Sequence, residues 1–278
     1  MPDKFKAVWV SHSSISDFLK CPRFYYLRNV YKDPKSGHKI TIMKPALALG
    51  QAVHDVIDSL STLPVATRFE KPILGKFDVV WENVSGKKGG FKSKAEEMEF
   101  KERGRKMLQK IMDNPGPLKN KALKLKSVEG DPKLSWYWLS EEDNLILSGK
   151  IDWVEYVEDS DGIHIIDFKT GKNEEDKNSL QLPIYYLLAK NLQRRNVEKI
   201  SYWYLDNDTG MVEMKLPDGK EAHEKVYEVA KRMKLGRLID HLKCPKGGCF
   251  ACSGLEEILN GKGEKVGISE YRQDIYIL

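Results

Sequence analysis

The sequence lacks any long hydrophobic run. No apolar stretch approaches the roughly 18–20 residues that a membrane span requires, and the N-terminus lacks the apolar core of a signal peptide. These absences argue against a membrane-spanning helix and a secretory signal. They predict a protein of the cytoplasm, a reducing compartment, with no membrane partner.

Excess charge of one sign is also missing. Lysine and arginine together number 46 and aspartate and glutamate 41, so the formal net charge is only +5. A surplus this small is compatible with a polyanionic partner but identifies none. Internal repeats and low-complexity tracts are absent as well. The 278 residues, 41% of them hydrophobic, instead predict a folded protein with one large domain.

Cysteine is rare, and its layout is uneven. Cys21 stands alone, whereas Cys244, Cys249 and Cys252 form a tight triplet. In a reducing compartment this layout favours metal ligation over disulfides. Four thiolates suit a tetrahedral Zn²⁺ or a [4Fe–4S] cluster, although a zinc ribbon usually brings two local pairs. Unliganded thiols are the third alternative.

Apolar periodicity predicts a series of helices, at residues 12–27, 46–60, 92–112, 179–195 and 220–242. Ser13 or Ser14 is expected to cap the first helix, which runs into a break at Cys21-Pro22. Residues 61–130 are expected to form a helical insertion or cap beside the core, with a lysine-rich stretch at 119–126.

Two hairpins follow from strand-like segments around turn sequences. The first joins residues 145–157 to 163–169 through the turn Glu158–Gly162, and the second joins 200–205 to 211–216 through a turn at 206–210.

The first hairpin carries a carboxylate pair. Side chains alternate along a strand, so Asp167 and Lys169 share a face, and folding about Ser160 brings Asp152 beside them. Two close carboxylates repel each other unless a cation lies between them, and Mg²⁺ or Mn²⁺ prefers such oxygen ligands. With a neighbouring lysine, such an ion suits phosphodiester hydrolysis. A surface Asp–Lys pair is the plainer interpretation of the hairpin alone.

Three further polar residues flank this hairpin. Gln181 and Tyr185 lie four residues apart and so share a helical face. His54 lies on an otherwise apolar helix. Taken singly, His54 is interpreted as a buried histidine, and the other two as packing or surface residues.

Four sequence pieces occur in order: GQAVH at 50–54, GKIDWVE at 149–155, IIDFKTGK at 165–172 and QLPIYYLL at 181–188. Together they resemble the PD-(D/E)XK nuclease superfamily, and specifically its RecB-like branch, which includes AddB and the CRISPR-associated adaptation nucleases. Ile151 stands before Asp152 where the name of the family has proline, which is an ordinary variation in this superfamily.

The resemblance implies an α/β, restriction-endonuclease-like core over residues 1–278, with a central mixed sheet flanked by helices. It implies a Mg²⁺ or Mn²⁺ site whose ligands are His54, Asp152, Asp167 and the Phe168 carbonyl. Lys169 would be the catalytic lysine, and Gln181 with Tyr185 would contact DNA or support the site.

The cysteine layout resembles the iron–sulfur subgroup of these nucleases, in which one cysteine before the core joins three after it. This implies a structural [4Fe–4S] cluster that staples the two ends of the domain, held by Cys21, Cys244, Cys249 and Cys252. In this sequence the wider gap, between Cys244 and Cys249, precedes the CxxC pair, which is the reverse of the order in the subgroup. A structural Zn²⁺ therefore remains an alternative to the iron–sulfur cluster.

The implied function is that of a DNA exonuclease or end-trimming nuclease, with single-stranded DNA preferred. It would act in recombination, repair, CRISPR adaptation or phage replication, beside a helicase or a CRISPR or recombination protein. Two alternatives are a catalytically silent DNA-binding subunit and a metal-stapled structural protein. The segments Arg23–Arg28 and Tyr202–Tyr204 suit either base stacking or packing, and packing is preferred for Trp203.

Overall fold

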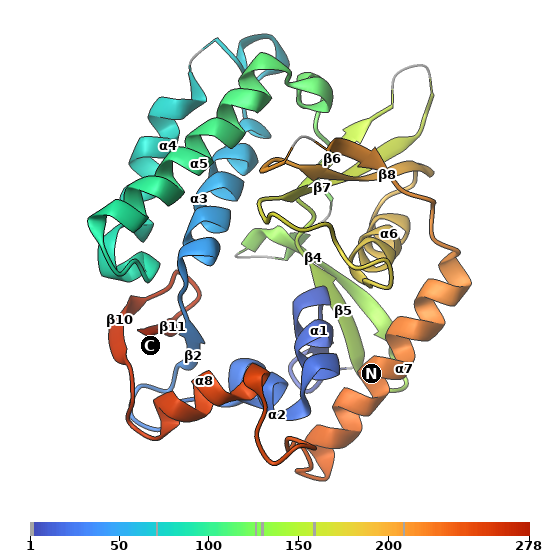
Figure 1. Cartoon of the computed structure of the whole chain (residues 1–278). Coiled ribbons are helices and arrows are strands. Elements are labelled where there is room, and N and C mark those ends of the chain that lie inside the picture. Colours follow the sequence, from blue (N-terminus) through green and yellow to red (C-terminus); the bar gives the residue numbers. More distant parts are fainter. Residues whose placement is uncertain (1–2, 71, 126, 129–130, 158–159, 208) are drawn as a thin grey trace.

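The computed structural model describes residues 3–70, 72–125, 127–128, 131–157, 160–207 and 209–278. In this part of the chain the strands form three sheets with helices packed against them (Figure 1). The predicted mixed α/β class is therefore confirmed. None of the described helices is both long and apolar enough to cross a membrane.

The sheet that carries the candidate site has the order β6-β7-β8-β9. Its strands are β6 (Trp153–Tyr156), β7 (Ile163–Lys169), β8 (Val197–Tyr204) and β9 (Gly210–Glu213). β7 runs antiparallel to β6 and parallel to β8. Because side chains alternate, Ile163 and Ile165 pack on one side of β7, and Ile166 and Phe168 pack on the other. Both faces are apolar, so each requires a covering layer.

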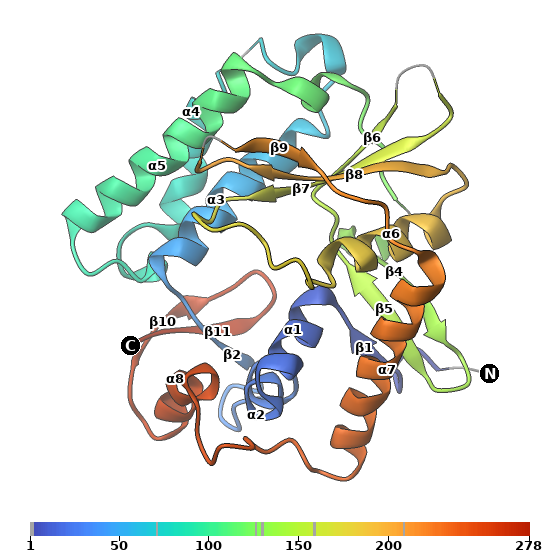
Figure 2. The same cartoon turned by 45° about the vertical axis from the view of Figure 1, so that its right-hand side comes forward.

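One face is covered by three helices: α3 (Pro45–Leu60), α4 (Ile73–Trp81) and α5 (Lys94–Asp113). α3 buries a stripe of side chains that recurs every three or four residues from Ala48 to Leu60. α6 (Gln181–Leu192) packs against the other face, so the strands lie between α3 and α6 (Figure 2). Short 3₁₀ turns lie at Val65–Thr67, Glu82–Val84, Gly86–Gly89 and Gly116–Lys119.

A second sheet has the order β1-β5-β4-β3. Its strands are β1 (Val8–Val10), β3 (Ser127–Val128), β4 (Asp131–Ser140) and β5 (Leu145–Gly149). It shares one apolar core with α6, α1 (His12–Lys20) and α7 (Gly219–Leu238).

The third sheet joins the two ends of the chain. Its order is β10-β11-β2, with β2 (Lys39–Ile42), β10 (Glu264–Ile268) and β11 (Gln273–Ile277). It packs with α8 (Phe250–Leu259), α2 (Pro22–Tyr25) and the π-helical turn Tyr26–Val30.

The segment 145–157 was predicted as one strand, and this prediction was wrong. It forms β5 and β6 in different sheets, separated by residues 150–152. At the break, Asp152 Oδ2 accepts the backbone N–H of Phe168 at 2.9 Å. The side chain takes a hydrogen bond that a strand carbonyl would otherwise accept, so the ladder with β7 ends there. This break directs Asp152 toward β7.

The predicted helices at 46–60, 92–112, 179–195 and 220–242 are confirmed as α3, α5, α6 and α7. The break at Cys21 is confirmed too, but the expected cap was wrong. Ser11 is the cap, because its Oγ accepts the N–H of Ser14 at 3.3 Å and its own N–H donates to Ser14 Oγ at 2.8 Å. Ser13, the other candidate, lies inside the helix. The pattern also missed the short helices α4 and α8.

Some predictions involve residues that the structure does not describe. Glu158 and Asp159 of the first turn, Asp208 of the second turn and Lys126 of the lysine-rich stretch lie outside the described residues. The assignment of residues 61–130 as an insertion stays a prediction.

Candidate functional site

Two side chains on one face of β7 form the centre of the site. Asp167 is only 2% exposed, and its Oδ1 accepts a hydrogen bond from Gln181 Nε2 at 2.7 Å. Its Oδ2 lies 3.0 Å from the Lys169 ammonium. The alternation along β7 places the acid and the lysine side by side. The pair is thus present, but it is buried rather than a solvated surface pair.

The Lys169 ammonium is surrounded by acceptors. Besides Asp167, it contacts Glu175 Oε2 at 2.8 Å and donates to Gln181 Oε1. The ring centroid of Tyr202 lies 4.8 Å from it. Of its three N–H groups, one is accepted by Gln181, while the carboxylates of Asp167 and Glu175 lie at ion-pair distance. Sequence reasoning missed Glu175, because it lies in the irregular segment between β7 and α6, where no periodicity marks it.

Gln181 and Tyr185 share one face of α6, as predicted. The Gln181 amide accepts from Lys169 through Oε1 and donates through Nε2 to Asp167 and, at 3.2 Å, to the Tyr185 hydroxyl. Both residues are buried. In this arrangement they hold the acid and the lysine in place.

His54 and Asp152 form the second half of the site. His54 Nδ1 lies 3.3 Å from Asp152 Oδ2, the oxygen that also accepts the Phe168 N–H. A strand residue points its N–H and its C=O to the same side, so the Phe168 carbonyl is directed toward Asp152 as well. Three of the four predicted ligand residues therefore gather at the end of β6.

Burial and charge shift the pKa values of these groups. Burial raises the pKa of Asp167 to about 7, and the neighbouring Asp152 adds to the rise. Burial opposes protonation of His54, but the neighbouring acids, Asp152 first and then Asp167 and Asp58, together raise the pKa of His54 to about 9. Burial also acts to raise the pKa of Asp152, yet His54 holds it below its usual range. Asp152 and Asp167 thus repel each other, and a divalent cation between them would relieve this repulsion.

The donor chemistry fits a hard divalent cation. Asp167 Oδ2 is buried and accepts no hydrogen bond, although Lys169 is within ion-pair distance. Carboxylate, imidazole and carbonyl donors are ligands that Mn²⁺ accepts, and Mg²⁺ prefers the oxygen donors among them. Among the described residues, however, the four cysteines are the only group whose ligand atoms all lie within 4.8 Å of one another. Asp152, Asp167 and His54 must therefore draw together to share one ion.

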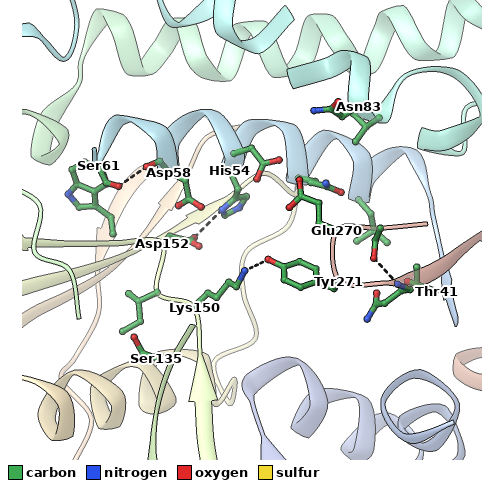
Figure 3. A pocket seen from close by; sticks show the side chains of 18 of the residues that line it. Thr41, His54, Asp58, Ser61, Asn83, Ser135, Lys150, Asp152, Glu270 and Tyr271 are labelled. Carbon is green, nitrogen blue, oxygen red and sulfur yellow. Dashed lines mark hydrogen bonds and ion pairs between the residues drawn. The ribbon is translucent and has the colours of Figure 1, made fainter. Parts of the chain in front are cut away.

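A cleft of about 990 Å³ opens beside His54 and Asp152 (Figure 3). One wall is α3, another is the segment 150–154, and a third is the turn between β10 and β11. Asp167 and Lys169 are absent from its lining. The site therefore has two sides. His54 and Asp152 line the open cleft, whereas Asp167 and Lys169 lie on the buried side.

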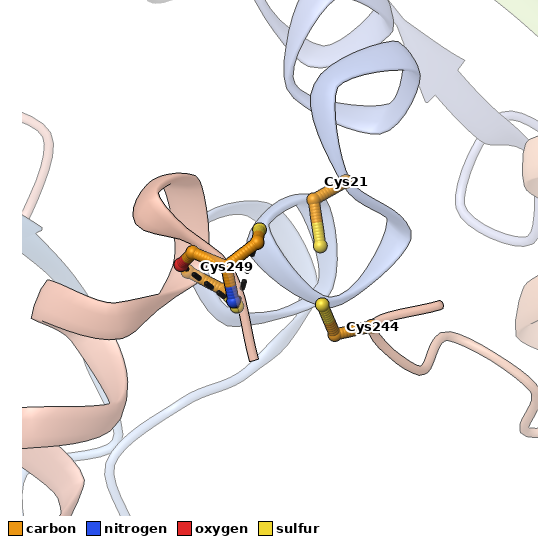
Figure 4. Close-up of side chains that lie close together, drawn as sticks. Cys21, Cys244 and Cys249 are labelled. Carbon is orange, nitrogen blue, oxygen red and sulfur yellow. Dashed lines mark hydrogen bonds between the residues drawn. The ribbon is translucent and has the colours of Figure 1, made fainter. Parts of the chain in front are cut away.

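The four cysteines form a separate candidate metal centre (Figure 4). Cys21 lies between α1 and α2, Cys244 follows α7, Cys249 caps α8 and Cys252 lies in its first turn. All four thiols are free, and their sulfur atoms lie within 4.8 Å of one another. The predicted gathering of Cys21 with the triplet is confirmed, and the group could hold a metal.

The thiol at the start of α8 is suited to ligation. The backbone N–H groups there, first that of Cys252, lower the pKa of Cys249 to about 7. A thiolate, the form that binds metals, is therefore accessible near neutral pH. Side chains of α2, α8 and β2 surround the cluster with apolar groups.

The two aromatic segments with alternative interpretations are used for packing. The arginines at the ends of Arg23–Arg28 pair with Glu256 at 2.6 Å and Asp17 at 3.1 Å, and the tyrosine and leucine at 25 and 27 are buried. In Tyr202–Tyr204 both tyrosines are buried, and the tryptophan ring lies 5.5 Å from that of Phe168. The remaining rings of the two segments, Phe24, Tyr26 and Trp203, are partly buried against the apolar cores.

A family model and a solved structure are similar to this chain. The family model described as the PD-(D/E)XK nuclease superfamily matches residues 9–265. None of the curated proteins matches the chain. Among solved structures, a candidate exonuclease from Eubacterium rectale is similar, with 14% identity, a TM-score of 0.47, and coverage of 94% of this chain and 91% of that one. Since the family match spans nearly the whole chain, with both candidate centres inside it, the chain belongs to the PD-(D/E)XK nuclease superfamily.

Proposed function

We propose that this chain is a divalent-metal-dependent DNA nuclease of the RecB-like branch, which trims or degrades DNA from single-stranded ends. One observation carries the proposal: a histidine and an acid at the cleft adjoin a buried acid–lysine pair, through His54, Asp152, Asp167 and Lys169. Burying such charges costs free energy, and DNA binding alone gives no reason to retain them. Its context would be recombination, repair, CRISPR adaptation or phage replication.

The roles follow from the positions of the side chains. The residues that would hold Mg²⁺ or Mn²⁺ are His54, Asp152, Asp167 and Phe168, the last through its carbonyl. When bound, the ion supplies a polarised phosphoryl oxygen and a water of lowered pKa. The Lys169 ammonium lies beside Asp167. There it would orient the ion-bound water or balance negative charge on the phosphate. Gln181 fixes the acid and the lysine, and Tyr185 fixes Gln181.

The test is a cleavage assay on linear and circular DNA, single- and double-stranded, with Mg²⁺, with Mn²⁺ or with a chelator. We expect cleavage of linear single strands that requires the ion and is lost in Asp167→Ala and Lys169→Ala, while circles resist. Cleavage of circles would replace end-trimming by an endonuclease activity. DNA binding without cleavage in any divalent ion would favour a silent DNA-binding subunit beside a helicase.

At the four cysteines we propose a structural metal centre that joins α1 and α2 to α8. The sulfur spacing, within 4.8 Å, admits a single Zn²⁺ directly, because thiolates 2.3 Å from one zinc lie about 3.8 Å apart. A [4Fe–4S] cluster, which the resemblance implies, places the thiolates on different irons and requires them to stand farther apart. Iron and zinc analysis separates the two: brown protein with about four irons per chain, or colourless protein with about one zinc.

For either metal, Cys249→Ala should lose the bound metal and lower the melting temperature together, because the centre joins segments far apart in sequence. Retention of both metal and stability would contradict the structural role.

A further inference from the structure

The third wall of the cleft carries an aromatic side chain that the proposed chemistry does not use. Tyr271 lies in the turn between β10 and β11, lines the cleft and is nevertheless 60% exposed. It lies beside the segment that leads into Asp152 (Figure 3). The aromatic segments considered above are packed, whereas this ring has a face open to the cleft.

Lys150 and the turn hold the ring in position. The Lys150 ammonium lies 4.5 Å from the ring centroid and contacts the Tyr271 hydroxyl. Ser269 and Gln273 close the turn, since the N–H of Ser269 donates to the Gln273 carbonyl at 2.9 Å and the N–H of Gln273 to Ser269 Oγ at 3.1 Å. Because Lys150 stands two residues before Asp152, the ring is fixed close to the proposed ion site.

The hairpin that carries Tyr271, formed by β10 and β11, belongs to a sheet that packs against α8. β11 pairs in parallel with β2, and this sheet shares an apolar core with α8, the helix that carries Cys252. The ring is thus attached to the cysteine centre through packed elements.

We propose that Tyr271 is a stacking platform for an unpaired base of the strand that enters the cleft, and that Lys150 pairs with an adjoining phosphate. This rests on the proposed nuclease function and specifies its substrate. Bases stack on exposed rings whatever their identity, while lysines follow the backbone. Only an unpaired base offers a free face, so the platform selects single strands or frayed ends.

The cleft carries charges of both signs. Lys88, Lys124 and Lys150 line it, and so do Asp55 and Asp58 of α3, Asp152, and Glu270 beside Tyr271. The three lysines lie outside α3, so they favour a path for the phosphates away from the acids of that helix.

The experiment compares Tyr271→Ala and Tyr271→Phe with Phe5→Ala, a control at an aromatic that is 88% exposed and absent from the cleft lining. It measures kcat and KM on linear single-stranded DNA with Mn²⁺, and the Kd of a fluorescent oligothymidylate with Ca²⁺. Tyr271→Ala should raise KM and Kd about 5- to 150-fold, the range for loss of one stacked base, with kcat little changed. Tyr271→Phe keeps the ring but loses the contact with Lys150, so it should raise KM and Kd much less than Tyr271→Ala, and the control should match wild type.

The outcomes distinguish the platform from the function on which it rests. Cleavage by wild type with unchanged KM and Kd in Tyr271→Ala would overturn the platform alone. Equal losses in Tyr271→Ala and Tyr271→Phe would overturn it too, because they would assign the effect to the hydroxyl and not the ring. Absence of both cleavage and binding in wild type would overturn the function as well. If Tyr271→Ala melts below wild type, Tyr271→Leu repeats the test with an apolar side chain that has no ring.

Discussion

Two polar clusters meet on β7, one around His164 and the other around Asp167 and Lys169, and they differ in how completely their polar atoms are hydrogen-bonded. In one, the His164 ring joins Glu155 Oε1 at 2.9 Å to Ser201 Oγ at 2.8 Å, and Asn120 donates to the other Glu155 oxygen at 2.9 Å. The order Ser–His–Glu is that of a hydrolytic triad. All three residues of that order are buried, and none of them lines the cleft described above.

The other cluster, formed by His54, Asp152, Asp167 and Lys169, reaches the cleft through His54 and Asp152, whereas Asp167 and Lys169 do not line it. Asp167 Oδ2 is among the buried polar atoms of the described residues that lack a hydrogen bond, whereas Glu155, His164 and Ser201 contribute none. The pKa of Asp167 is raised to about 7, mainly by burial. A cluster whose polar atoms are all hydrogen-bonded stabilises the fold, while a carboxylate oxygen that accepts no hydrogen bond, beside residues that line a cleft, retains capacity to bind an ion. The two clusters contain similar residue types. What distinguishes the candidate ion site is a carboxylate oxygen without a hydrogen bond and the presence of His54 and Asp152 in the cleft.

The largest effect should come from Asp167→Asn, which keeps the shape of the side chain but removes its charge. Loss of an ion ligand should lower kcat/KM on single-stranded DNA by at least about a hundred- to a thousandfold. Steady-state assays in Mn²⁺ measure this. A variant with near wild-type activity would place the ion site elsewhere.

Glu155→Gln should have the opposite profile. It leaves His164 without its anionic partner inside the sheet, so stability should fall by about 1–3 kcal/mol, while kcat/KM per folded molecule stays at the wild-type value. Thermal unfolding and active-site titration measure both quantities. Glu213→Gln, at an exposed position on β9, is the matched control. A hundredfold loss of activity with unchanged stability would give the buried triad a catalytic role.

When a chelator is present, the stability of the protein should depend on pH through Asp167. The pKa of Asp167 rises from 3.8 to about 7 in the folded chain, so the folded state binds a proton that the unfolded chain has already released. The stability from this group is present below about pH 4 and is lost as the pH rises through about 7. Asp167→Asn should therefore melt above wild type at pH 8, and Mn²⁺ should narrow the gap by stabilising wild type. Equal melting temperatures in the chelator would contradict the raised pKa.

The smallest effect is expected at Glu175, the missed partner of Lys169. Its side chain is 25% exposed, and an ion pair of this kind is worth up to about 1 kcal/mol. Glu175→Gln frees part of the ammonium and should raise kcat/KM by less than about fivefold, whereas Glu174→Gln, an exposed neighbour, should have no effect. A fall of a hundredfold would make Glu175 part of the ion site.

Regular spacing explains which site residues could be read from the sequence. The face shared by Asp167 and Lys169 follows from the two-residue period of a strand, and that shared by Gln181 and Tyr185 from the turn of a helix. These relations hold wherever the element is placed in the fold. The approach of His54 required the ordered motifs, because no local period connects α3 to β7.

The rest of the site depends on tertiary packing that leaves no local pattern. Glu175 lies in an irregular segment, and Tyr271 reaches the cleft only because β11 pairs with β2, more than two hundred residues earlier in the chain. His164 stands in an apolar strand with its partners on β6 and β8, so no local pattern distinguishes it. The break at Asp152 likewise arises from a hydrogen bond to Phe168 on another strand.

The most direct test is the rate at which wild type and Asp167→Asn cleave end-labelled single-stranded DNA, measured over a titration of Mn²⁺. We expect no cleavage by wild type in the chelator, a saturable rise with Mn²⁺, and no rise in Asp167→Asn at matched DNA binding. Equal cleavage by the two proteins, or full wild-type cleavage in the chelator, would contradict a divalent-metal nuclease centred on Asp167.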